Sequence, residues 1–145
     1  MEQENYTIAL LIDAENISAK YMSVLNKELI MFGRIIYKRI YANFTDNSMN
    51  KWKNVINEFA LTPVQQFSYT KGKNATDSRL IIDAMDILYE NMVNAVCIVA
   101  SDSDYTTIAK RIKESNVFVF GAGEEKTPNS FINACDRFLD LNLLM

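Results

Sequence analysis

The chain has 145 residues, 49% of them hydrophobic, which predicts one globular domain with a core of its own. It carries 15 basic residues, 18 acidic residues and no histidine, which excludes histidine-dependent hydrolases and zinc sites with histidine ligands. No apolar run approaches the roughly 20 residues that span a bilayer. The acidic first residues also lack the pattern of a signal peptide, so we expect a cytoplasmic protein with no membrane partner.

The two cysteines, Cys97 and Cys135, lie among apolar residues and do not share CxxC spacing. We therefore expect buried, reduced thiols rather than a disulfide framework.

The first half of the chain alternates short apolar runs with amphipathic segments. The run over residues 6–12 ends at Asp13 and predicts a strand buried on both faces. We expect a helix over 18–32 that Ser18 caps, then a strand over 34–41. A second helix is expected to begin at Asn47 or Ser48, and a short strand to follow over 64–69.

The second half continues the alternation after a polar loop at 70–75. Its predicted elements are a helix over 76–91, a strand over 95–100, a helix over 104–114, a strand over 116–120 and a short helix from 129 or 130. The glycines at 121 and 123 are interpreted as the end of the last strand. This alternation predicts an α/β fold, in which residues 1–145 form a single domain around a mostly parallel sheet.

Two of the predicted strands run directly into acidic residues. Asp13 follows the first strand, and Asp102 and Asp104 follow the strand over 95–100. Parallel strands end at one edge of a sheet, so these acids converge if the two strands are neighbours. Asp77, at the start of the long helix, should face the same edge.

Carboxylates gathered so closely repel one another, and a hard cation such as Mg²⁺ or Mn²⁺ relieves that repulsion. A bound metal also reverses the charge of the site, so the acidic composition is compatible with a nucleic-acid substrate.

Each acid also has a simpler structural interpretation. Asp13 can be a turn residue, Asp104 a helix cap, and Asp77 a partner of the helix dipole. Asp83 lies about 120° around the helix from Asp77 on ideal geometry, which favours an ion pair with Arg79 four residues earlier.

Further candidates for substrate contacts lie near the same predicted edge. They are Asn16, Ser101, Lys71, Lys73, Tyr69 and Tyr105. The amide and hydroxyl could bind a phosphate or a carboxylate, the lysines could contact phosphates, and the tyrosines could stack on bases. The alternatives are turn residues, solvated lysines and half-buried packing residues.

Three strings of residues resemble the NYN domain family, the limkain-b1/LabA-like branch of the PIN-like nuclease superfamily. They are IDAENI at 12–17, KGKNATD at 71–77 and VASDSDY at 99–105, and the segment SFINACDRFLDL at 130–141 resembles the family's closing segment. The resemblance covers nearly the whole chain in the right order.

The resemblance implies a Rossmann-like, three-layer α/β/α sandwich with a metal-dependent ribonuclease site at the carboxyl edge of the sheet. It assigns metal binding to Asp13, to Asp77 and to the acids after the fourth strand, Asp102 and Asp104. Asn16 matches the polar residue that follows the first acid, and Asp83 matches a second acid on the helix. Family members often carry a further RNA-binding module after this domain.

We therefore expect a ribonuclease, in the first instance an endonuclease, that uses Mg²⁺ or Mn²⁺ and cleaves single-stranded RNA. A homodimer would lengthen a shallow binding surface. The first alternative is a binding module of the same fold that holds RNA or a regulatory partner without cutting. The second is a magnesium-dependent phosphatase or receiver, which Ala14 and Glu15 after Asp13, and Gly121 after the last strand, disfavour.

Overall fold

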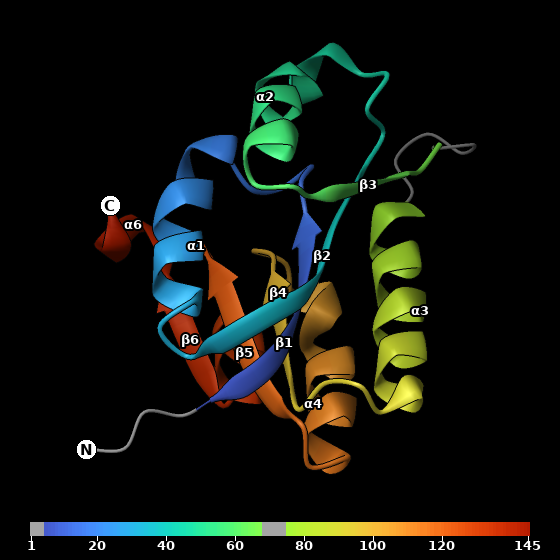
Figure 1. Cartoon of the computed structure of the whole chain (residues 1–145), viewed down its shortest axis with the longest axis vertical. Helices are drawn as coiled ribbons and strands as arrows, with labels where there is room; N and C mark the ends of the chain where they lie inside the picture. Colours follow the sequence, from blue (N-terminus) through green and yellow to red (C-terminus); the bar gives the residue numbers. More distant parts are fainter. Residues whose placement is uncertain (1–4, 68–74) are drawn as a thin grey trace.

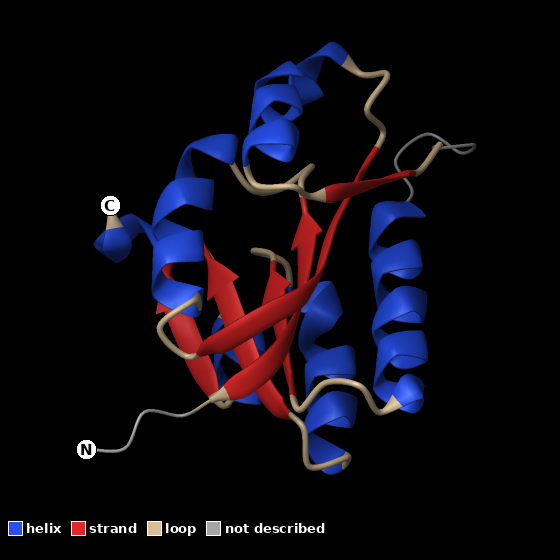
Figure 2. Ribbon diagram, viewed as in Figure 1, coloured by secondary structure: helices blue, strands red, loops and turns tan. Residues whose placement is uncertain are grey.

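The computed structural model describes residues 5–67 and 75–145, with the side chains of 75–77 left out. Its centre is a sheet of six parallel strands in the order β3-β2-β1-β4-β5-β6 (Figures 1 and 2). The strands are β1 (Tyr6–Asp13), β2 (Gly33–Ala42), β3 (Thr62–Gln65), β4 (Ala95–Val99), β5 (Phe118–Gly123) and β6 (Arg137–Asp140). The predicted α/β fold with a parallel sheet is confirmed.

Helices cover both faces of the sheet and complete the three layers. One face carries α1 (Met22–Leu29), α2 (Asn50–Glu58) and α6 (Leu141–Leu144), and the other carries α3 (Ala75–Glu90), α4 (Thr106–Glu114) and α5 (Asn129–Ala134). Short 3₁₀ turns lead into three of the helices: η1 (Ala19–Tyr21), η2 (Asn47–Met49) and η3 (Ser103–Tyr105). Each turn is capped by the side chain of the preceding residue, namely Ser18, Asp46 or Asp102, which satisfies a backbone N–H.

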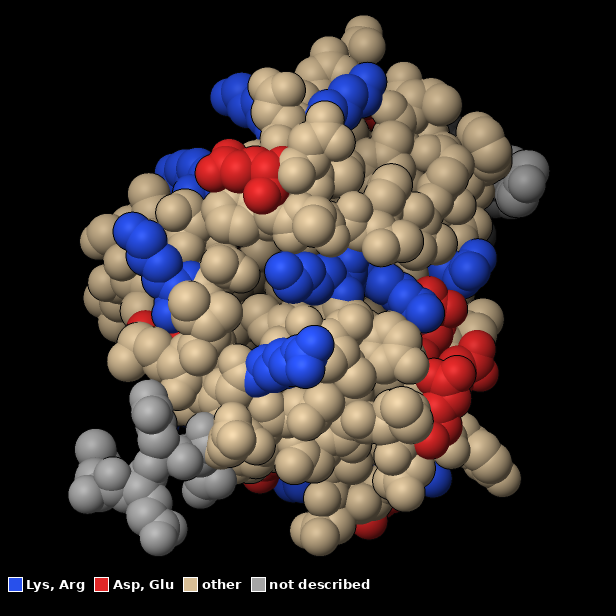
Figure 3. All heavy atoms as spheres, in the orientation of Figure 1, with Lys and Arg blue, Asp and Glu red and all other residues tan. Residues whose placement is uncertain are grey.

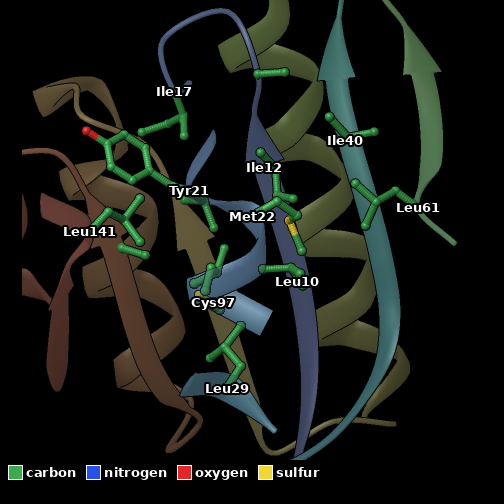
Figure 4. Packing of buried hydrophobic residues seen from close by; sticks show 14 of the residues in the cluster. Leu10, Ile12, Ile17, Tyr21, Met22, Leu29, Ile40, Leu61, Cys97 and Leu141 are labelled. Carbon is green, nitrogen blue, oxygen red and sulfur yellow. The ribbon is translucent and has the colours of Figure 1, made fainter. Parts of the chain in front are cut away.

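The core forms two layers because side chains alternate along each strand. On β1, Ile8, Leu10 and Ile12 face α1 and α2, while Ala9 and Leu11 face the helices of the other layer. Figure 4 shows Leu10 and Ile12 lying close to Met22 of α1. Full burial of a Leu or Ile contributes about 1.5–3 kcal/mol, so β1, buried from residue 8 to 13, anchors the sheet.

The end of the sheet differs from the sequence-based prediction. The glycines expected to end the strand at 120 lie inside β5, and β6 was not predicted. A Cβ on Gly121 would lie 2.5 Å from Cys135 Sγ, and one on Gly123 would lie 2.5 Å from the carbonyl oxygen of Ala100. These glycines allow close packing of neighbouring segments and do not interrupt the strand.

The thiols of Cys97 and Cys135 are free and buried, as predicted. Burial raises the pKa of Cys135 to about 12 and that of Cys97 further, which disfavours the nucleophilic thiolate form of both. In the described part of the chain, no helix is long and apolar enough to cross a membrane.

Candidate active site at the carboxyl edge of the sheet

The two strands that end in acidic residues lie side by side. β1 pairs with β4, and their last paired residues are Ile12 and Val99. The chain then leaves β1 towards α1 on one face and leaves β4 towards α4 on the other. In doubly wound sheets the crevice at such a switch point is where ligands bind. The prediction that these strands are neighbours is confirmed.

Asp13 is the last residue of β1 and lies at this switch point with no solvent exposure. Its side chain follows the alternation of the strand and faces the layer of α3 and α4. Its Oδ2 accepts a hydrogen bond from Asn16 Nδ2 at 2.9 Å and another from the Tyr105 hydroxyl at 3.1 Å. Its Oδ1 is equally buried and accepts no hydrogen bond from any described residue.

This environment makes the Asp13 carboxylate electrostatically costly. Burial raises its pKa above the ordinary value, and the charge of Glu15 raises it further, while hydrogen bonds from Asn16, from Tyr105 and from the backbone N–H of Glu15 lower it. A buried acceptor without a partner costs about 1–3 kcal/mol, and more when it is charged. A proton or a cation at Oδ1 would relieve this cost. Oδ1 is a carboxylate oxygen, the type of ligand that hard divalent ions prefer, so this residue fits such an ion.

Asp102 and Asp104 lie in the turn that follows β4. Asp102 is half-buried and caps η3, because its Oδ1 accepts a hydrogen bond from the backbone N–H of Asp104 at 2.9 Å. Asp104 is exposed. The capping role that the sequence allowed for Asp104 thus belongs to Asp102.

Among the side chains that the structure describes, no three acidic or thiol groups come close enough to hold a metal ion together. Asp77 lies in the first turn of α3, which begins at the end of the sheet towards which the strands point (Figure 1), but its side chain is outside the described part. Lys71, Lys73 and Tyr69 also lie outside the described residues. The four-aspartate metal site therefore stays a prediction.

Asp83 is engaged in a separate buried network. Its Oδ2 accepts a 2.7 Å hydrogen bond from the Tyr41 hydroxyl and lies 3.4 Å from Arg39, and its Oδ1 accepts from Arg79 Nε at 3.2 Å. The predicted Arg79–Asp83 pair is confirmed. Both oxygens have cationic or hydroxyl partners, so this carboxylate stabilises the packing of α3 on β2. That arrangement argues against Asp83 as a direct metal ligand.

Tyr105 is a packing residue, which the sequence allowed as the alternative to stacking on bases. Its side chain is fully buried and so is not available to stack on a base. Its hydroxyl instead orients Asp13. A signal was present in the sequence, because Tyr105 precedes the buried Ile108, Ala109 and Ile112 at helical spacing.

Ser101 helps to connect three loops at the same edge. Its Oγ accepts hydrogen bonds from the backbone N–H of Glu124 at 2.9 Å and from the Thr127 hydroxyl at 3.2 Å. The carboxylate of Glu124 in turn accepts from the backbone N–H of Ser18 at 3.2 Å. The loops after β4, β5 and β1 are thereby joined, and Ser101 satisfies a backbone N–H, which was the structural alternative for this residue.

Comparison with solved structures supports the fold. The chain is similar to a protein of unknown function from Vibrio parahaemolyticus, known from a crystal structure, with a TM-score of 0.77. The two share 17% sequence identity over 97% of this chain and 95% of that chain, so the similarity shows the fold alone. A search of curated proteins found no match.

Comparison with models of protein families matches residues 7–142 to the NYN domain. The match runs from β1 to α6 and includes Asp13, Asp77, Asp102 and Asp104. The chain belongs to the NYN domain family.

Proposed function

We propose that this protein is a divalent-metal-dependent ribonuclease that cuts within single-stranded RNA. The observation that carries the proposal is the buried Asp13 carboxylate at the switch point of the sheet, with one oxygen held by two donors and the other without a partner among the described residues. Membership of a family that consists generally of nucleases supports the reaction class.

In this proposal some residues orient Asp13 and others bind the metal ion. Asn16 and Tyr105 fix the orientation of Asp13 by donating to Oδ2, which leaves Oδ1 as the ligand atom. Asp77, Asp102 and Asp104 would complete the oxygen donors, which suit Mg²⁺ or Mn²⁺. A bound divalent ion would supply Lewis-acid stabilisation of the charge that develops on the phosphate during hydrolysis.

Contacts with the RNA backbone require positive charge despite the net charge of −3. On the face shown in Figure 3, Lys and Arg side chains spread across the middle, one group of acidic side chains lies along the side that α3 forms, and another acidic group lies near the top beside basic side chains. The basic side chains in the middle of this face are compatible with contacts to a polyanion. Lys71 and Lys73 are proposed to bind the phosphates of the RNA strand beside the metal ions. A cytoplasmic location and a homodimer that lengthens the RNA-binding surface belong to the same proposal.

The test is cleavage of an end-labelled single-stranded RNA in Mn²⁺ and in EDTA. We expect Mn²⁺-dependent cleavage by the wild type and background cleavage by Asp13→Asn and Asp102→Asn. Asp86→Asn, which removes an exposed carboxylate from α3, is the matched control and should retain activity. Cleavage at the wild-type rate by both site variants would refute the assignment.

A second candidate is an NYN module that binds RNA or a regulatory partner without cutting it. Two observations favour it: within the described side chains no three acids gather, and Asp102 is engaged as a cap. The same experiment separates the two candidates, because this module would bind the labelled RNA and leave it intact in Mn²⁺.

A further inference from the structure

A pocket of about 330 Å³ lies on the side of the switch point that faces α2. Its walls come from the loop after β1, from the start of α2 and from the loop after β5. Its lining includes Asn16, Ser48, Met49, Lys51, Trp52 and Lys126. Of the residues that line it, only Asn16 is a candidate for substrate binding on the sequence alone.

The floor of this pocket is apolar and firmly held. Ala14, Ile17, Met49 and Trp52 are all buried members of the core. The indole N–H of Trp52 donates to the carbonyl oxygen of Ile17 at 3.1 Å, which ties α2 to the loop after β1. A preformed apolar floor under a polar rim is typical of small-ligand sites.

The charges on the rim are not equivalent. Glu15 accepts a hydrogen bond from the backbone N–H of Asn43, and Glu124 accepts one from that of Ser18, both at 3.2 Å. Lys51 and Lys126 are exposed and form no ion pair within the described part of the chain. The acids are thus held by the scaffold, while the two ammonium groups are open to an anion.

Asn16 connects this pocket to the candidate active site. It lines the pocket, and its amide donates to Asp13 Oδ2 at 2.9 Å. A ligand in the pocket that contacts Asn16 would therefore be separated from the Asp13 carboxylate only by the Asn16 side chain. Pockets of about 300–1,000 Å³ hold small ligands, and this one is at the lower end of that range, which suits a single nucleotide.

We infer that this pocket holds the nucleotide next to the cleaved bond of a single-stranded RNA. Its base and ribose would lie on the floor formed by Met49 and Trp52, and its flanking phosphates would contact Lys51 and Lys126. The choice of RNA as the ligand rests on the proposed function. The shape and charge of the pocket come from the structure.

The test measures binding of a fluorescent single-stranded RNA of mixed sequence by anisotropy in EDTA, so that the readout does not depend on cleavage. The double variant Lys51→Ala/Lys126→Ala should bind at least about tenfold more weakly at physiological salt. Each lost phosphate contact lowers the salt slope by about 0.7 for single strands, so the slope should fall by about 1.4. Lys27→Ala/Lys110→Ala makes the same change of charge on exposed residues of α1 and α4 and should change binding less than about twofold.

A second variant tests the pocket without changing any charge. Ser48 is exposed and lines the pocket, so Ser48→Trp should fill it and weaken binding at least about tenfold, whereas Asn54→Trp on the exposed side of α2 should not. The inference is overturned if the wild type does not bind, if the lysine pair behaves like its control, or if Ser48→Trp binds normally. Pocket-dependent binding without Mn²⁺-dependent cleavage would uphold the pocket as a nucleotide-binding site and overturn both the nuclease assignment and the placement beside a cleaved bond.

Discussion

Replacing Asp13 by Asn should make the metal-free protein more stable at neutral pH. The carboxylate has no solvent exposure, and Oδ1 has no hydrogen-bond partner among the described residues. In the variant, the amide oxygen can accept the hydrogen bonds from Asn16 and Tyr105, while the amide nitrogen takes the place of Oδ1. The substitution removes a buried charge without creating a cavity.

The size of the effect follows from the cost of an unsatisfied buried group, about 1–3 kcal/mol and more when it is charged. The unpartnered amide keeps part of that cost, so we expect a gain of about 1–2 kcal/mol, or about 3–6 °C in melting temperature for a chain of this length.

The sign of the pH dependence follows from the raised pKa of Asp13 in the folded state. The protonated carboxyl stabilises the fold fully below its unfolded pKa, and this stabilisation is lost as the pH rises through the folded pKa. The advantage of the variant should therefore be largest at neutral pH and vanish below about pH 4.

Thermal denaturation followed by circular dichroism, in EDTA and over a pH series, measures this difference. Asp102→Asn is the matched control, because Asn caps a helix about as well as Asp and should change stability by less than about 0.5 kcal/mol. Mn²⁺ at about one hundred times its Kd should stabilise the wild type by about 2.7 kcal/mol and leave Asp13→Asn unchanged. An Asp13→Asn variant that is less stable than the wild type at every pH would refute the reasoning.

Three further substitutions test the surroundings of the site. Tyr105→Phe removes a hydrogen-bond donor from Asp13 and should cost about 1 kcal/mol of stability. Because loss of this donor raises the pKa of Asp13, the acidic limb of the pH–rate profile for Mn²⁺-dependent cleavage should move to higher pH, and an unchanged profile would contradict this. Asp83→Asn should lower the free energy of unfolding in urea by about 1–2 kcal/mol, a moderate loss because its arginine partners are partly solvated. The variant should keep its stabilisation by Mn²⁺, and loss of that stabilisation would indicate that Asp83 is a metal ligand. Gly123→Ala should cost about 1–3 kcal/mol because the new Cβ meets backbone; an unchanged urea midpoint would show that the loop yields.

Most of the fold was predictable from the sequence because β1 and β4 are short apolar runs with acidic residues after them. Their adjacency followed from the usual order of doubly wound sheets, and the pairing of Ile12 with Val99 confirms it. β6 was missed because Arg137–Asp140 has only four residues and mixed polarity. β5 was ended too early, since a glycine that allows close packing has the same appearance in a sequence as a glycine that ends a strand.

The site was less predictable, because its important features are contacts between distant residues. Asp13 could be identified as a candidate, but not the fact that one oxygen has two donors and the other has none. Asp83 and Arg79 are four residues apart and were predicted as a pair, whereas the hydrogen bond from Tyr41 to Asp83 joins β2 to α3 and has no local signal. Local spacing therefore predicted the helical pair, and only the packing of the sheet revealed the rest.

The placement of Asp13 also separates structural from functional carboxylates in this chain. Asp83 is nearly as buried, yet hydroxyl and guanidinium donors engage both of its oxygens. In the described residues, Asp13 Oδ1 is the one buried polar side-chain atom without a partner. Asp83 shows that a buried carboxylate in this layer can have both oxygens hydrogen-bonded. The unsatisfied Oδ1 of Asp13 lies at a ligand-binding crevice and lowers stability without improving the packing. That contrast within a single layer of the core is the physical reason to assign binding to Asp13 and support of α3 to Asp83.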